Sequence, residues 1–139
     1  MGSRPGKGGI VDIRRFCHNR GDEFSPFKYY VNKARTRNKE YGFEQTNLTV
    51  EFLKELWDKQ NGICPLSGWK MHMPATTLIW NSEPSHPKRA SLDRITPRKP
   101  YNEDNVRFVC HIANMAKHAY SDEEVIAFCK AVADQNKSL

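Results

Sequence analysis

The sequence predicts a mixed α+β domain in which a two-stranded antiparallel ribbon is followed by a helix and flanked by further helices. Two short apolar runs, residues 91–95 and 106–109, enclose a loop rich in proline, asparagine and aspartate. Before and after these runs, apolar residues repeat at the three- and four-residue spacing of amphipathic helices. A chain of 139 residues has room for one such domain.

Residues 1–24 are expected to form a flexible basic arm, and residues 25–139 the single folded domain. Glycines recur among basic residues in the arm, and such a composition seldom buries enough apolar surface to become ordered.

Two helices are expected at the start of the folded domain. Ser25 as N-cap and Pro26 in the first turn predict a helix that ends at Gly42. Thr49 begins a second helix, which Asn61 and the glycine after it end.

The middle of the chain predicts short extended segments joined by turns. Residues 64–68 form a tight turn, residues 69–73 and 76–80 form short strands or a ribbon, and residues 81–88 form a loop. After the second apolar run, a helix begins near Cys110. Ser121 and Glu124 have the spacing of a capping box and begin the last helix, in which Cys129 falls on the apolar face and is expected to be buried.

The formal net charge is +6 and the pI is near 9.2, which suits binding to a polyanion such as nucleic acid. A solubilising surface is the alternative explanation. No apolar run approaches the length of a membrane span or of a signal peptide, so we expect a cytoplasmic protein without membrane contact. Much of the basic excess falls in the first third of the chain, at Arg14, Arg15, Arg20, Lys28, Lys33, Arg35, Arg37 and Lys39.

Hard oxygen ligands on rigid elements are what a divalent ion needs if it is to cleave phosphodiesters. Asp93 on the first strand and Asn114 on the following helix are suitable in type and placement. Taken singly, neither residue is informative, because an isolated aspartate is usually a cap or a surface charge.

Asp93 and Asn114 belong to a larger set of motifs that follow one another along the chain. One run spans residues 47–68, and a second set comprises Ala90, Ser91, Leu92, Asp93, Arg94, Ile95, Tyr101, Asn105, Val106, Phe108, Val109, Asn114 and Lys117. In order and spacing these segments resemble the small phage and bacterial HNH endonucleases, also called the ββα-metal or His-Me finger class. With the last helix included, the resemblance covers about residues 25–133.

The resemblance implies a role for each matching residue. Asp93 and Asn114 would bind Mg²⁺ or Mn²⁺, and Asn105 would tie the loop to the backbone and keep the site in shape. Lys117 would contact the phosphate or the leaving group, with a solvated lysine as the alternative. His111, Asn114 and His118 share one helical face, so His118 is a further candidate metal ligand and His111 a candidate catalytic residue. Surface or supporting roles are the alternative for both histidines.

The sequence departs from the family pattern at two places. Arg94 stands where the general-base histidine is usual, as in a branch with an Asp-Arg-Ile core. Arginine stays protonated, so we expect Arg94 to bind the scissile phosphate, while metal-bound water or one of His86, His111 and His118 supplies the base. Cys64 is followed by Ser67 instead of a second cysteine, so no structural zinc is expected.

The function implied is a metal-dependent endonuclease acting on DNA, most of all on duplex DNA, and cleavage of both strands would favour a homodimer. The main alternative is a nucleic-acid-binding module with the same fold that has lost catalysis, for which the missing histidine is the best argument. A basic scaffold protein is a third reading, and it predicts neither metal binding nor salt-sensitive DNA affinity.

Overall fold

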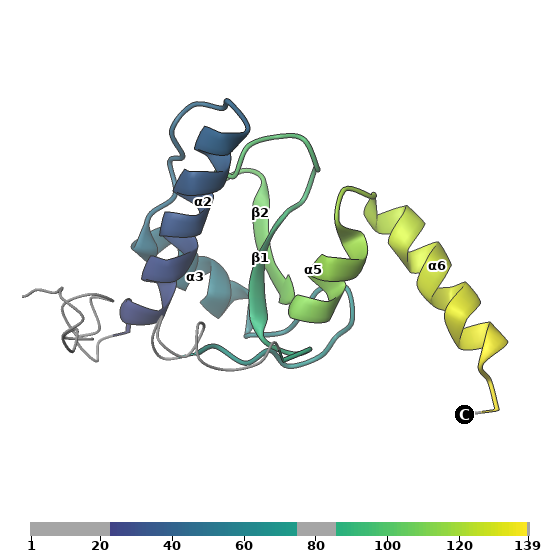
Figure 1. The fold of residues 1–139 in the computed structure, drawn as a ribbon. Helices are drawn as coiled ribbons and strands as arrows, with labels where there is room; N and C mark the ends of the chain where they lie inside the picture. Colours follow the sequence, from purple (N-terminus) through teal and green to yellow (C-terminus); the bar gives the residue numbers. More distant parts are fainter. Residues whose placement is uncertain (1–22, 75–85, 139) are drawn as a thin grey trace, which may run out of the picture.

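The computed structural model describes residues 23–74 and 86–138 and has a mixed α+β architecture (Figure 1). The expected basic arm lies almost entirely outside the described residues, as does the expected strand at residues 76–80. Among the described residues, no helix has the length and apolar composition needed to cross a membrane. The elements in chain order are η2 (Ser25–Phe27), α2 (Lys28–Glu40), α3 (Val50–Gln60), β1 (Ala90–Arg94), β2 (Val106–Cys110), α5 (His111–Lys117) and α6 (Asp122–Gln135).

The two predicted strands pair as an antiparallel ribbon. In its register Leu92 lies opposite Phe108, and Asp93 lies opposite Arg107. Helix α5 follows β2 directly and packs against both strands, while α2 and α3 lie on the other side of the ribbon (Figure 1). The prediction of two paired strands with a helix packed across them is therefore confirmed.

Phe108 lies at the centre of the core and is fully buried. The rings of Phe27, Tyr30 and Trp57 meet it edge-on, with ring centroids 6.0, 5.1 and 5.4 Å away. These rings come from η2, α2 and α3, so a single side chain of β2 joins three helical segments to the ribbon. Edge-to-face packing of this kind adds to the stabilisation from burial of the rings.

The helix ends agree with the sequence at α3, at the start of α6 and at the C-terminal end of α2, where Gly42 follows the last turn with φ 77°, but not at the start of α2. Thr49 Oγ1 accepts a hydrogen bond from Phe52 N, and Asn61 ends α3 in the left-handed conformation with φ 54°. The capping box at the start of α6 is present. The predicted N-cap role of Ser25 is wrong, because residues 25–27 form a 3-10 turn before α2 and neither helical start has a side-chain cap. Ser25 is instead buried at the edge of the core.

Two further expectations are corrected. Residues 69–73 do not form a strand: Lys70 and His72 make only isolated bridges, to Ile63 and Arg89. Cys129 is exposed, not buried. The reason is that α6 extends away from the ribbon after its first turn, so the buried residue of this helix is Val125 (Figure 1).

The outer edge of β2 is closed by one side chain of α3. Gln60 Nε2 donates to the carbonyl oxygen of Phe108 at 2.8 Å, and Gln60 Oε1 accepts from Phe108 N at 2.9 Å. The side-chain amide therefore pairs with the backbone as a third strand would, which satisfies polar groups at a fully buried residue.

Replacing Gln60 by alanine should leave both backbone groups of Phe108 without this partner and lower the free energy of unfolding by about 1–3 kcal/mol. Urea denaturation measures the change. Lys59→Ala, at the neighbouring exposed position, should change the stability by less than about 0.5 kcal/mol. Equal effects of the two substitutions would contradict the proposed edge-closing role.

Candidate functional site

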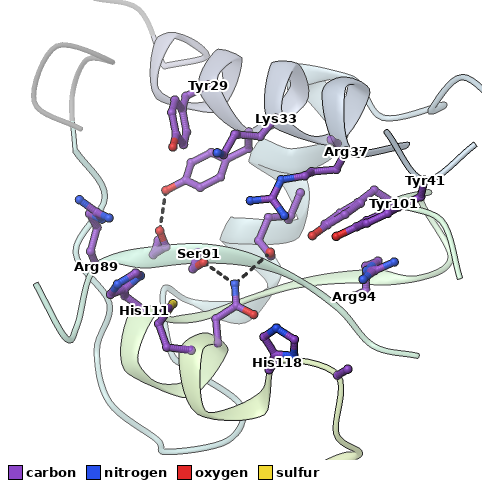
Figure 2. A pocket seen from close by; sticks show the side chains of 17 residues that line it. Tyr29, Lys33, Arg37, Tyr41, Arg89, Ser91, Arg94, Tyr101, His111 and His118 are labelled. Atoms are coloured by element: carbon purple, nitrogen blue, oxygen red, sulfur yellow. Dashed lines mark hydrogen bonds between the residues drawn. The ribbon is translucent and has the colours of Figure 1, made fainter. Parts of the chain in front are cut away.

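A pocket of about 530 Å³ lies between α2, β1 and α5 (Figure 2). Four cationic side chains from α2 and from the two ends of β1 line it, and they are Lys33, Arg37, Arg89 and Arg94. None of the described residues that line the pocket is an aspartate or a glutamate. An anion that enters therefore meets positive charge with no carboxylate beside it.

Helix α2 provides one wall of the pocket through residues spaced by four. Tyr29, Lys33 and Arg37 recur at this interval and lie on one side of the helix, and Tyr41 follows at its C-terminal end. Figure 2 shows Lys33 and Arg37 directed from α2 toward β1. This interval is visible in the sequence and is the signal that could have identified these residues as part of the site.

The opposite wall is formed by α5. His111, Asn114 and His118 all line the pocket, so the face expected from their spacing does converge there. His118 ends the helix with φ 45°. Asn114 Nδ2 donates to Ser91 Oγ at 2.6 Å and to the Leu92 carbonyl oxygen at 3.4 Å. This leaves the amide oxygen of Asn114 as the atom that can bind a ligand.

The Arg94 guanidinium lies close to two tyrosine rings at one end of the pocket. Its Cζ lies 4.8 Å from the ring centroid of Tyr41 and 5.1 Å from that of Tyr101. Arg94 Nη1 also donates to the Lys99 carbonyl oxygen at 3.2 Å. The two ring contacts and the hydrogen bond restrict the movement of the guanidinium, which suits binding of a phosphate.

The surroundings of His111 in the pocket shift the pKa of its imidazole. Burial lowers its pKa, and repulsion from the nearby Arg89 guanidinium lowers it further. The lowered pKa favours the neutral imidazole, which can accept a proton.

Asparagine side chains hold the loop that places Tyr101 at the pocket. Asn105 Oδ1 accepts from Thr96 N, while its Nδ2 donates to the carbonyl oxygens of Thr96 and Pro100. These are the loop-holding contacts expected of Asn105. The buried Asn38 of α2 does the same from the other side, accepting from Tyr101 N at 2.9 Å and donating to its carbonyl oxygen at 3.2 Å.

Asp93 lies in a buried ion-pair network and does not line the pocket. Asp93 is 3% exposed, and its Oδ2 accepts hydrogen bonds from Lys117 Nζ at 3.0 Å and from Arg107 Nε at 2.9 Å. Lys117 is fully buried, and its Nζ also donates to the carbonyl oxygens of Arg94 and Ile95. Lys117 is thus neither a solvated lysine nor a lining residue of the pocket.

Asp122, at the start of α6, completes the network. Its Oδ1 lies 2.7 Å from Arg107 Nη2 and 3.4 Å from Lys117 Nζ. The network thus contains two carboxylates and two cations, so its formal charge is zero. The hydrogen bond from Arg107 lowers the pKa of Asp122, although partial burial opposes this shift.

The three expected metal ligands are divided between the pocket and the network. Asn114 and His118 line the pocket, whereas the carboxylate of Asp93 is occupied by two cations. In the described parts of the chain, no three His, Cys, Asp or Glu side chains are grouped so that they could hold a metal ion. The donor set in the pocket does not fit a Mg²⁺ or Mn²⁺ site that depends on Asp93, because hard divalent ions need carboxylate or several other oxygen ligands.

Replacing Asp93 by asparagine should lower the free energy of unfolding by about 3–5 kcal/mol, because Lys117 and Arg107 would keep their buried charges without this carboxylate. Chemical denaturation measures the loss, and Asp104→Asn in the exposed part of the loop is the matched control. The double variant Asp93→Asn/Lys117→Met should be less destabilised than the sum of the single variants. If Asp93 were an open metal ligand, Asp93→Asn would leave the stability unchanged or increase it.

The lowered pKa of Asp122 predicts an acid-sensitive fold. A carboxylate with a lower pKa in the folded state stabilises the protein above its unfolded pKa of about 3.9, and this contribution is lost as the pH falls below that value. The urea midpoint should therefore decrease between about pH 5 and pH 3. In Asp122→Asn the decrease should be shallower than in Asp134→Asn, which alters an exposed carboxylate on the same helix. Identical slopes in both variants would show that Asp122 is not the group that responds.

Comparison with known proteins found no relative of this chain. No family model matches it, and neither a curated protein nor a solved structure shows significant similarity to it.

Proposed function

We propose that this chain is an endonuclease that binds a DNA phosphodiester in the pocket and hydrolyses it, with β1, β2 and α5 as a ββα-metal core. One observation supports this proposal above the others: four cationic side chains line a pocket whose described lining contains no carboxylate. Phosphate neutralisation supplies most of the affinity of proteins for nucleic acid, so such a pocket suits a phosphodiester backbone.

Each pocket residue has a role that follows from its chemistry. The fixed guanidinium of Arg94 binds the scissile phosphate and stabilises the charge that develops on its oxygens. Lys33 and Arg37, one helical turn apart on α2, contact the phosphates of the same strand.

His111 is suited to act as the general base because its lowered pKa favours the neutral imidazole. It takes a proton from the attacking water, the water oxygen bonds to phosphorus, and the bond from phosphorus to the leaving oxygen breaks. The leaving oxygen then takes up a proton, for which solvent or His118 is available at the pocket wall. A divalent ion remains an expectation from the sequence, and no step is assigned to it.

A nucleic-acid-binding module without catalysis is the second candidate, and the position of Asp93 favours it. The carboxylate that the family resemblance assigns to the metal is paired with Lys117 and Arg107. A protein that only binds DNA would keep the cationic pocket and would have no need of a metal-binding carboxylate in it.

Incubation of plasmid and linear DNA with Mg²⁺, with Mn²⁺ and with EDTA distinguishes the two candidates. We expect nicking by the unmodified chain, slower cleavage by about 10²–10⁴-fold in His111→Ala, and strong loss in Arg94→Ala. Arg35→Ala alters an exposed arginine of α2 outside the pocket and should leave the rate unchanged. Because the pKa of His111 is lowered, the acidic limb of the rate profile should lie below about pH 6.5.

DNA binding without cleavage under any of these conditions would support the non-catalytic module. Full activity in both Arg94→Ala and Arg37→Ala would contradict the assignment of the pocket as the phosphate site.

A further inference from the structure

Two tyrosine rings give one end of the cationic pocket an aromatic wall. The rings of Tyr41 and Tyr101 both lie close to the Arg94 guanidinium, and Figure 2 shows the three side chains together at this end. Tyr41 follows the last residue of α2, and the loop between the strands contributes Tyr101. Both therefore come from elements that the ribbon holds in place.

The Tyr41 ring is 48% exposed, although it lines the pocket. Its side chain interacts with that of Arg37, and this interaction raises the pKa of the Arg37 guanidinium. Tyr101 is more deeply placed, with its backbone fixed by Asn38. The aromatic wall thus consists of the partly buried ring of Tyr101 and the more exposed ring of Tyr41, and both rings contact Arg94.

We infer that this end of the pocket binds an unpaired nucleobase, stacked on Tyr41 and the Arg94 guanidinium, so that the substrate is a single-stranded or locally unpaired segment of DNA. The inference rests on the proposed function, because it assumes that the neighbouring cations bind the backbone of the same strand. In a duplex, each base is stacked between its neighbours and offers only its edges to a protein. The face of a base reaches an aromatic ring only when the base is unpaired or turned out of the helix.

The arrangement of charge and rings matches what a single strand presents. Successive nucleotides carry a phosphate on one side and a flat apolar base on the other. The pocket places Lys33 and Arg37 along α2 and the Tyr41 ring at the end of the same helix. Positively charged grooves with aromatic platforms bind single strands with little sequence preference, because every base has a face that can stack.

The test compares binding of a single-stranded oligonucleotide with binding of a hairpin duplex of the same sequence, in EDTA so that cleavage does not interfere. Both probes contain 2-aminopurine, whose fluorescence is quenched when it stacks on an aromatic ring. We expect tighter binding and stronger quenching for the single strand. Tyr41→Leu should weaken single-strand binding by about tenfold and abolish most of the quenching, while Tyr41→Phe retains both.

Tyr120→Leu is the matched control, because Tyr120 is an exposed tyrosine that does not line the pocket. Thermal unfolding of each variant shows that it remains folded. Equal affinity for the two probes, or quenching that survives Tyr41→Leu, would overturn the inference and leave the proposed nuclease intact if the duplex is bound and cut. Failure to bind either probe would overturn the inference and the proposed function together.

Discussion

The ion-pair network of Asp93, Arg107, Lys117 and Asp122 is the constraint on which the rest of the structure depends. Its members come from β1, β2, the last turn of α5 and the first turn of α6, so one set of charges fixes four elements relative to one another. Buried charges are tolerated only when they are paired and hydrogen-bonded. An alternative packing of α5 on the ribbon would leave Lys117 without its carboxylate and its two backbone acceptors.

The network also determines the electrostatics of the pocket. The two carboxylates of the network, Asp93 and Asp122, are paired with Arg107 and Lys117. None of these four residues lines the pocket, so the positive charge of Lys33, Arg37, Arg89 and Arg94 is not offset by a carboxylate in its wall. Charges of opposite sign are thus paired inside the fold, whereas charges of one sign gather at the surface where a polyanion can reach them.

The network pairs its charges inside the fold, whereas the described wall of the pocket contains cations and no carboxylate. The pocket is therefore suited to bind phosphate whether or not the protein is a catalyst. Helix α5 connects the two regions, because its Lys117 belongs to the network and its Asn114 lines the pocket. His111 and His118 are placed by the same helix. A change in the network would therefore move the residues proposed to act on the substrate.

The sequence by itself determined the secondary structure around the site. Thr49, Asn61 and the capping box of Ser121 with Glu124 act on backbone groups within a few residues, and so their effect is local and predictable. The pairing of β1 with β2 followed from two apolar runs around a turn-rich loop, and the shared face of His111, Asn114 and His118 from helical periodicity. Ser25 is one exception, since its burial is a tertiary effect that overrode its preference for a cap.

Only the tertiary structure decided which charged residues face each other and which face the pocket. The spacing of Asp93 and Lys117 is compatible with a metal site, a phosphate contact or an ion pair, and residues 24 positions apart meet only because α5 folds back onto β1. Likewise, Tyr41 and Tyr101 are brought to Arg94 by the packing of α2 against the ribbon, which buries Tyr30 against Phe108. Local spacing fixes which residues share an element and a face, whereas the partner of a buried charge is set by long-range packing.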